Sequence, residues 1–290
     1  MRKDVKKPNL FILGAPKCGT TSLATWLAEH PNIFMSNPKE PHFFSSDLKN
    51  RAVTKPACYY SLFCKASSES QVIGEASTWY LFSKTAIDNI ERECPGSRFI
   101  VMVRDPVEMA YSLYLHNFRK LIENASSFQE AWNLQDERRK GENIPKYCRE
   151  PAFLQYYEAC SLGSLCERLL CKVSEKRVIF IALEKIKLCP KTEYEKVLSF
   201  LKLVGDNRES FPVVNQAREC KSKLVHRIIA SGSNLKKKLG IQNSFSMTKF
   251  NEKRIYEKEK LSSTFLNELE SKFKYEKDTL KNILDGTSHD

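Results

Sequence analysis

Short apolar runs alternate with segments of helical spacing along the first two thirds of the chain. Residues 10–13 are apolar and stop at Gly14, and an amphipathic pattern that begins near Thr21 follows, with Leu23 and Leu27 on one face. Further apolar runs that predict strands lie at 33–35, 72–74, 99–103 and 177–186. Strands that alternate with helical segments in this way are typical of an α/β fold with a parallel sheet.

The run at 99–103 is the clearest of these strands. It is unbroken and lies between Pro95-Gly96 and Asp105-Pro106, which is typical of a parallel strand buried on both faces. Helical spacing predicts one amphipathic helix over 152–172, another over 194–203, and more helix over 261–284. We expect a single domain over residues 1–285 and a loose tail at 286–290.

Two polar segments are assigned to helices as well. The charged stretch 117–150 is predicted to be mostly helical, with its run of charges at 136–140 on a solvated face. After the strand that ends at Gly74, Ser77 or Thr78 is predicted to cap the next helix.

Composition places the chain among ordinary globular proteins. Of its 290 residues, 41% are hydrophobic and 28% are charged. With 47 Lys and Arg against 35 Asp and Glu, the net charge is +12, which favours an anionic glycan, a nucleic acid, a membrane surface or a nucleotide. No signal peptide and no apolar run of roughly 20 residues is seen, so we expect a cytoplasmic protein without a transmembrane segment.

The ten cysteines leave the redox state open, because an even count is compatible with disulfide bonds. Their spacing is irregular, however, and includes no C-x-x-C pair for a metal or redox site. Cys160, Cys166 and Cys171 fall in an apolar helical stretch. We expect these three to be reduced core residues.

The loop after the first strand has the composition of a phosphate site. Gly14 and Gly19 lie five apart, so the backbone can turn and present its N–H groups to an anion at the start of the next helix. The spacing is close to the nucleotide loop G-x-x-x-x-G-K-[ST], but Thr20 stands at the lysine position and Lys17 lies inside the loop. This departure argues against an ATPase or GTPase. The alternative is an ordinary glycine turn.

Glu40 and His42 form a candidate acid–base pair. They are two residues apart in a proline-rich stretch, so on an extended backbone both side chains point the same way, as a general base for a hydroxyl requires. The alternative is that Glu40 pairs with Lys39 or a surface arginine while His42 packs in a loop.

Arg104 stands directly after the predicted strand 99–103, where open α/β sheets bind ligands. Ser112 lies about two turns into the helix that follows, so both side chains can reach one dianionic phosphate. The alternative is a strand-end arginine that pairs with Asp105.

Four segments together resemble a known family. These are GAPKCGTTSL at 14–23, KEPHFF at 39–44, GEASTWY at 74–80 and RDPVEMAYS at 104–112. They resemble motifs of the sulfotransferases that use 3′-phosphoadenosine 5′-phosphosulfate (PAPS), nearest to the glycan-modifying, heparan-sulfate-type branch. The resemblance implies a P-loop-like three-layer α/β fold, with a central parallel sheet flanked by helices, and direct sulfuryl transfer without a metal.

The resemblance also implies roles for single residues. Lys17 would bridge to the leaving phosphate oxygen, Glu40 would be the base, and His42 would support the acceptor site. The 5′-phosphate would be held by the loop residues Lys17, Cys18, Gly19, Thr20, Thr21 and Ser22. Arg104 and Ser112 would bind the 3′-phosphate. In heparan-sulfate-type relatives a lysine often stands near the sulfate at the position of Ala76, so that substrate is not assigned here.

The acceptor stays open at this stage. The motif at 39–44 favours a hydroxyl or amine of a carbohydrate or glycoconjugate over a small molecule, and no nucleic acid is expected; the oligomeric state is not predicted. Alternatives are a Mg-ATP-dependent kinase of a small molecule, a non-catalytic polyanion-binding protein, and a sulfotransferase relative that binds nucleotide without acting. The basic region 221–238 is either a solvated helix face or an acceptor groove.

Overall fold

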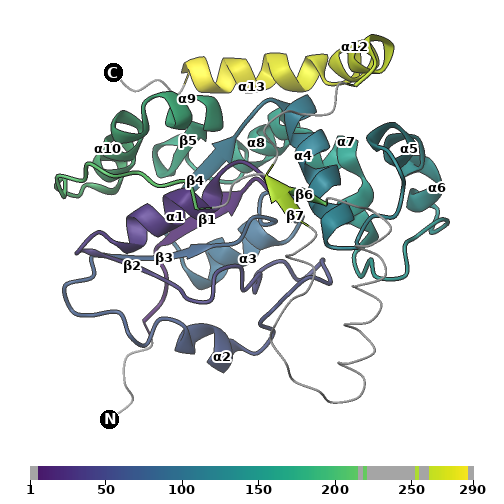
Figure 1. Cartoon of the computed structure of the whole chain (residues 1–290). Helices are drawn as coiled ribbons and strands as arrows, with labels where there is room; N and C mark the ends of the chain where they lie inside the picture. The colour runs from purple at the N-terminus through teal and green to yellow at the C-terminus, as the bar shows by residue number, and fades with distance from the viewer. Residues whose placement is uncertain (1–5, 215–217, 221–251, 255–260, 287–290) are drawn as a thin grey trace. The chain divides into compact units, whose positions relative to one another are not determined.

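The computed structural model describes residues 6–214, 218–220, 252–254 and 261–286 (Figure 1). The chain divides into two compact units. The first consists of residues 1–109, 160–215 and 272–290, and the second of residues 110–159 and 216–271. The single domain expected over 1–285, with its tail, therefore stays a prediction.

The first unit is built on a sheet of five parallel strands in the order β2-β3-β1-β4-β5. Their bounds are β1 Leu10–Gly14, β2 Ile33–Met35, β3 Val72–Ala76, β4 Arg98–Val103 and β5 Val178–Ala182. Every residue of β1 is buried, and so is every residue of β4 after Arg98. Both strands lie inside the sheet, which is why their sequences are unbroken apolar runs. The predicted α/β fold with a central parallel sheet is confirmed.

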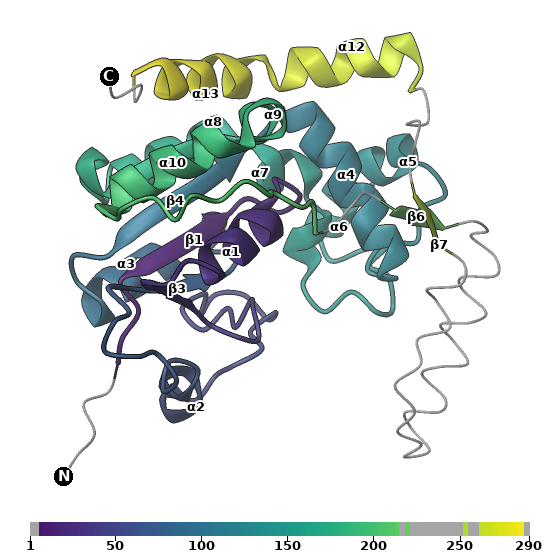
Figure 2. The same cartoon turned by 60° about the vertical axis from the view of Figure 1, so that its left-hand side comes forward.

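Helices cover both faces of this sheet (Figures 1 and 2). On one face lie α1 (Thr20–Ala28) and α10 (Pro190–Leu201), linked by the ring of Phe211, which packs edge-on against Trp26 and Tyr194. The other face carries α3 (Ala86–Glu93) and α8 (Leu162–Leu170), and just after α8 Lys172 pairs with Asp88 at 2.6 Å. The three layers match the expected architecture.

Shorter elements complete the first unit. They are α2 (Pro56–Ser61), the 3₁₀ turn η2 (Glu175–Arg177), α9 (Leu183–Leu188) and α13 (Lys274–Gly286). α13 packs along α8, where the buried Glu276 carboxylate accepts the amide and the hydroxyl of Ser164 at 2.8 and 2.7 Å. Gly163 allows this approach, because a Cβ there would lie 2.7 Å from the Glu276 carbonyl oxygen.

The second unit is mainly helical. Its elements are most of α4 (Pro106–Arg119), α5 (Phe128–Asn133), α6 (Gln135–Arg139), η1 (Pro151–Leu154), α7 (Tyr156–Cys160), most of α12 (Ser263–Lys272) and the antiparallel pair β6 (Arg218–Cys220) and β7 (Glu252–Arg254). Its core is aromatic: the Phe128 ring centroid lies 5.6 Å from Tyr114, 5.8 Å from Tyr156 and 5.6 Å from Phe265. Such pairs favour edge-to-face and tilted contacts.

Several helix predictions are wrong in detail. The single helix expected over 152–172 is divided into η1, α7 and α8, with breaks at Gln155 and Ser161. The side-chain amide of buried Gln155 donates to the Gln135 carbonyl at 3.0 Å, and the Gln135 side-chain oxygen accepts a hydrogen bond from the Tyr157 backbone N–H at 2.8 Å. A tertiary contact thus takes a backbone N–H group at the start of α7. The stretch 117–150 is only partly helical, and the strand expected over 177–186 ends at Ala182, where α9 follows.

The charged run at 136–140 does not form a uniform solvated face. The Arg138 side chain is fully buried, and its guanidinium donates to both carboxylate oxygens of Glu123 at 2.6 and 2.7 Å. The Tyr156 hydroxyl donates to the same carboxylate at 2.8 Å. The neighbouring Arg139 is half exposed and behaves as expected. The charge pattern of the sequence alone does not show which arginine is buried against a carboxylate and which one is exposed to solvent.

Cys160 and Cys166 are buried as expected, whereas Cys171 is exposed after the end of α8. The helical spacing over 261–284 is confirmed and forms two helices, α12 and α13. The basic region 221–238 lies outside the described residues. Among the helices in the described ranges, none is long and apolar enough to cross a membrane; the cytoplasmic location stays a prediction.

Candidate functional site

The predicted site residues of the first unit lie at the carboxyl ends of its strands. The glycine loop follows β1, the Glu40 segment follows β2, Glu75 is the last residue but one of β3, and Arg104 follows β4. Because the strands are parallel, all these ends meet at one edge of the sheet. The chain from β1 leads toward β2 and the chain from β4 leads toward β5, so β1 and β4 flank the position where α/β sheets bind ligands.

The loop between β1 and α1 has the form of an anion site. Gly14 has φ 140° and Gly19 has φ 86°, both in the region that glycine adopts readily. Space is also limited: a Cβ on Gly14 would collide with the Thr78 carbonyl oxygen, and one on Gly19 would lie 2.8 Å from the Leu183 side chain. Gly19 is the N-cap of α1, so the first amide groups of that helix face the loop without an intrahelical acceptor.

Single loop residues differ in what they offer an anion. The Cys18 side chain is fully buried against the Met109 sulfur at 3.9 Å, and burial raises the pKa of its thiol to about 12. Only the backbone of Cys18 is therefore available to a ligand. The Ser22 hydroxyl accepts the Val214 amide at 3.2 Å, which anchors the segment that follows α10 to the start of α1.

Arg104 connects the loop after β1 to the turn after β4. Its guanidinium donates to the Lys17 carbonyl at 3.2 Å and to the Glu108 carboxylate at 2.5 Å. Its Nε is buried and has no hydrogen-bond partner within the described residues. The pairing with Asp105 considered from the sequence is not seen; Asp105 pairs with Lys277 of α13 at 2.7 Å. Ser112 lies on α4 in the second unit, so its approach to the same phosphate stays a prediction.

Glu40 and His42 come together, but not on an extended backbone. Glu40 has φ 63° and His42 has φ 50°, so both are left-handed on either side of Pro41. The Glu40 carboxylate nevertheless lies 3.7 Å from His42 Nε2 and 3.5 Å from Lys39 Nζ. The juxtaposition was predicted correctly and the backbone that produces it was not. Non-glycine residues in this conformation concentrate at functional sites.

The surroundings of Glu40 keep its carboxyl ionised. Burial on its own raises the pKa of Glu40, but the His42 ring, with Nε2 3.7 Å from the carboxylate, and the positive charge of Lys39 outweigh burial and lower it to about 2. His42 is buried, with its Nδ1 unpartnered among the described residues and its ring packed edge-on to Tyr80. The carboxylate itself is open to solvent on one side.

The pairing of Lys39 with Glu40, considered as an alternative from the sequence, is present, but the sequence did not predict that Lys39 also contacts the start of α1. Its ammonium donates to the hydroxyls of Thr20 at 3.2 Å and Thr21 at 2.9 Å, and it faces Glu40. Burial lowers its pKa, although the Glu40 carboxylate acts in the opposite direction. The available signal was its position next to Glu40. No spacing rule indicated that it would reach the start of α1.

Glu75 explains how the segment GEASTWY at 74–80 supports the site. This fully buried carboxylate accepts hydrogen bonds from the Ser77 hydroxyl at 2.6 Å and from the Tyr59 hydroxyl. It also interacts with the Tyr80 hydroxyl. Ser77 and Tyr80 in turn accept the backbone amides of His42 at 3.0 Å and of Phe44. The network therefore fixes the backbone on which Glu40 lies.

The helix that Ser77 or Thr78 was expected to cap does not begin at these residues. β3 extends to Ala76, and the next helix, α3, begins only at Ala86, with Thr85 as its N-cap. The Ser77 hydroxyl is already committed to Glu75 and to the His42 amide, so it is not available for a helix end.

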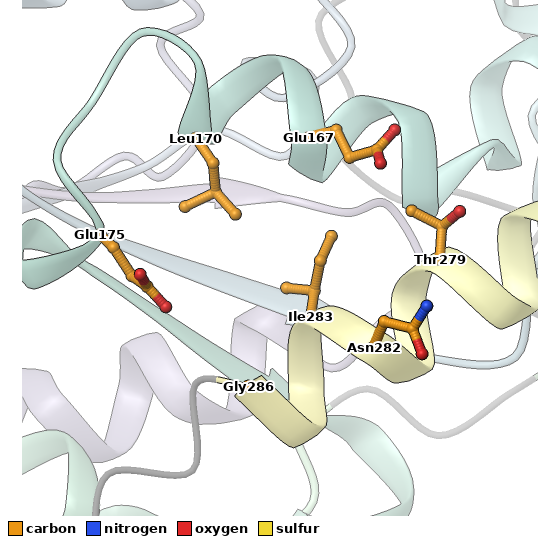
Figure 3. A pocket seen from close by; sticks show the side chains of 7 residues that line it. All are labelled: Glu167, Leu170, Glu175, Thr279, Asn282, Ile283 and Gly286. Carbon is orange, nitrogen blue, oxygen red and sulfur yellow. The ribbon is translucent and has the colours of Figure 1, made fainter.

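A hollow of about 380 Å³ lies elsewhere in the first unit, between α8, η2 and α13 (Figure 3). It is lined by Glu167, Leu170, Glu175, Thr279, Asn282, Ile283 and Gly286. None of these is a predicted ligand or catalytic residue. Within the described residues no group of three or more His, Cys, Asp or Glu side chains is placed to hold a metal ion.

The donor set at the sheet edge suits a phosphorylated nucleotide. It offers helix amides after Gly19, the hydroxyls of Thr20 and Thr21, the ammonium of Lys39 and the guanidinium of Arg104, whose buried Nε still lacks an acceptor. Donors and positive charge of this kind bind phosphate oxygens. Fold and site thus define an α/β protein whose loop after β1, at the carboxyl edge of its sheet, has the form of an anion site.

Comparison with known proteins identifies the family. Residues 7–274 match the sulfotransferase domain, and the chain belongs to that family. Carbohydrate sulfotransferase 15 of Homo sapiens is 32% identical over 167 residues, covering 42% of this chain and 29% of that protein. Heparan sulfate glucosamine 3-O-sulfotransferase 3A1 of Mus musculus is 31% identical over 113 residues, covering 39% of this chain and 27% of that protein. The chain thus matches less than a third of the length of these relatives.

A solved structure agrees with this assignment. The sulfotransferase from Alicyclobacillus acidocaldarius has a TM-score of 0.63 and 26% identity, and the match covers 84% of this chain and all of that one. The resemblance to sulfotransferases, nearest to the glycan branch, and the expected fold are confirmed. The roles of single residues stay predictions.

Proposed function

We propose that the protein transfers the sulfuryl group of PAPS to a hydroxyl or amine of a carbohydrate acceptor. One observation carries the proposal: the Glu40 carboxylate and the Thr20 and Thr21 hydroxyls share a single neighbour, the Lys39 ammonium. A candidate base thus lies beside the candidate phosphate site. Direct transfer needs this arrangement, because the acceptor oxygen has to approach the sulfur while a base takes its proton.

In this proposal the nucleotide, when bound, supplies an activated sulfuryl group on its 5′-phosphate. Glu40 takes the acceptor proton as the acceptor atom forms its bond to sulfur and the bond from sulfur to the phosphate oxygen breaks. Lys17 and the amides at the start of α1 stabilise the electron pair that stays on that oxygen. Arg104 and Ser112 hold the 3′-phosphate, and His42 orients Glu40 and the acceptor.

Family membership and the names of the relatives support a carbohydrate acceptor. Two of the relatives are named as a carbohydrate sulfotransferase and a heparan sulfate glucosamine 3-O-sulfotransferase. Ala76 at the end of β3 offers no charge to the site, so heparan sulfate itself is not assigned. The proposal includes no metal.

The first test is metal-free binding of the product nucleotide, adenosine 3′,5′-bisphosphate (PAP). Calorimetry in EDTA should detect binding of PAP at micromolar concentration, and Arg104→Ala should weaken it about 10- to 100-fold. ATP with Mg²⁺ is the comparison, because a kinase would require both. Binding of Mg-ATP alone would contradict the proposal. A polyanion-binding protein would instead show a steep dependence on salt and no dependence on Glu40.

The second test is transfer itself. Radiolabelled PAPS should label a carbohydrate acceptor with the wild type and not with Glu40→Gln. PAP binding without transfer to any hydroxyl or amine acceptor would favour a relative that binds nucleotide without acting.

A further inference from the structure

Lys39 lies where two parts of the proposed site meet. Its ammonium donates to the hydroxyls of Thr20 and Thr21, at the first positions of α1, and lies 3.5 Å from the Glu40 carboxylate. All four residues belong to the first unit. The ammonium therefore touches both the residues proposed to hold the 5′-phosphate and the residue proposed as base.

We propose that Lys39 is an exchangeable cation, held by Glu40 in the free protein and by the phosphosulfate of the nucleotide in the loaded protein. This inference rests on the proposed function. It assigns Lys39 a ligand role beside Lys17, and it gives Glu40 a different neighbour before and after the nucleotide binds.

The hydroxyl geometry supports the first half of the proposal. Each threonine oxygen that accepts an N–H from Lys39 has its own O–H proton left to donate elsewhere. The ammonium therefore orients both hydroxyls as donors, which an incoming phosphate requires. An anion that accepts from Thr20 and Thr21 also lies close to Nζ, since the two hydroxyls are only 3.2 and 2.9 Å from it.

The balance of charge supports the exchange. Glu40 offers the ammonium one negative charge and is exposed over 43% of its side chain, so water screens the pair. A phosphosulfate at the threonine hydroxyls carries more negative charge than the Glu40 carboxylate. It also lies in a less exposed position, because Thr20 is buried. The same ammonium then interacts more strongly with the nucleotide than with Glu40.

The exchange has a consequence for the base. While Lys39 faces Glu40, it contributes to holding the carboxylate in its ionised, weakly basic form. When the ammonium turns to the nucleotide, Glu40 retains His42 and loses one stabilising cation, so its affinity for a proton rises. The base is thus strengthened when the sulfuryl donor is present.

The experiment measures nucleotide affinity by calorimetry in EDTA, with folding checked by thermal unfolding. Lys39→Met, which keeps the length of the side chain without its charge, should weaken PAP binding about 10- to 100-fold. Lys39→Arg should weaken it less than about fivefold. Lys65→Met removes an exposed lysine of the same unit and should change nothing. Adenosine 3′-monophosphate, which lacks the 5′-phosphate, should bind Lys39→Met and wild type equally.

Glu40→Gln gives the signature of exchange, because it removes the competitor for the ammonium. PAP should bind about 3- to 10-fold more tightly to Glu40→Gln than to wild type, and this gain should vanish when Lys39→Met is also present. Equal weakening of PAP and adenosine 3′-monophosphate by Lys39→Met, or a gain that persists in the double variant, would overturn the inference. Failure of the wild type to bind PAP would instead overturn the proposed function.

Discussion

The carbonyl oxygen of Lys17 accepts a hydrogen bond from the Arg104 guanidinium at 3.2 Å, which joins the loop after β1 to the turn after β4. The two residues are 87 positions apart in sequence, and the segments that contain them follow neighbouring strands. The same arginine is paired with Glu108 at 2.5 Å. Arg104 thus supports the conformation of the loop in addition to its proposed role as a phosphate ligand.

Arg104→Ala is therefore expected to act mainly on binding. It removes a charged fork and a hydrogen bond to the loop backbone, so the PAP dissociation constant should rise about 10- to 100-fold in calorimetry. Arg92→Ala, at an exposed arginine, is the control and should leave affinity unchanged. Unaltered PAP affinity in Arg104→Ala would remove this residue from the nucleotide site.

Lys17→Ala should have the opposite profile. If its ammonium stabilises charge that develops on the leaving phosphate oxygen, kcat should fall about 100- to 1,000-fold, and the PAP dissociation constant should rise less than about 10-fold. Steady-state kinetics with PAPS and calorimetry with PAP separate the two effects. Full turnover in Lys17→Ala would refute the leaving-group role.

Glu40→Gln should lower kcat about 100- to 10,000-fold without weakening nucleotide binding. The lowered pKa of Glu40, about 2, keeps the carboxylate ionised in the free protein until the pH falls close to that value. The pH profile of kcat/KM should therefore show no decline due to Glu40 between about pH 5 and 8, since this ratio reports the free enzyme. If kcat/KM of the wild type declined within this range while that of an active Glu40→Asp variant did not, the decline would be due to Glu40 and would contradict this prediction.

Glu75 should make stability depend on pH. Burial raises the pKa of its carboxyl above the ordinary 4.5, although Ser77 and Tyr59 act in the opposite direction. Its contribution to stability is complete below the unfolded-state pKa and is lost as pH rises through the folded-state pKa. Relative to wild type, Glu75→Gln should become more stable between pH 4 and 7 in urea unfolding. A relative loss over this range would show that the folded carboxyl has a lowered pKa.

Arg138 and Arg139 form a matched pair for a stability test. Arg138→Met leaves the buried Glu123 carboxylate without its bidentate partner and should lower the free energy of unfolding by about 3–5 kcal/mol. Arg139→Met removes only exposed contacts with Asp136 and Glu158, so the urea midpoint should hardly move. Equal effects of the two substitutions would mean that the Glu123 pair contributes little.

The sheet and the positions of its site loops could be predicted because each depends on a local signal. The apolar runs of β1 and β4 are bounded by glycine or proline, and Gly14 and Gly19 mark the loop directly. Arg104 follows from its place at a strand end. These inferences require only the residue's neighbours in sequence.

The remaining features depend on partners distant in sequence. Lys39 reaches hydroxyls 18 and 19 residues earlier, and Arg138 finds its carboxylate 15 residues away. The helical pattern is interrupted near Gln155, where the Tyr157 backbone N–H donates to the side chain of Gln135, 22 residues earlier. The left-handed backbone at Glu40 is held by amide contacts to the β3 segment, where Glu40 N itself donates to the Ala76 carbonyl at 3.0 Å. The spacing of apolar residues along the chain does not indicate such contacts.

The strand order has a consequence for how such a protein diversifies. Under the proposed roles, the nucleotide loops follow β1 and β4, whereas Glu40 and its supporting network follow β2 and β3 on the other side of β1. Apart from Lys39, which contacts both parts, donor and acceptor recognition thus occupy separate halves of one edge. Insertions after β2 or β3 can change the acceptor while the donor loops are retained, so a family built on this sheet can acquire new acceptors without evolving a new donor site.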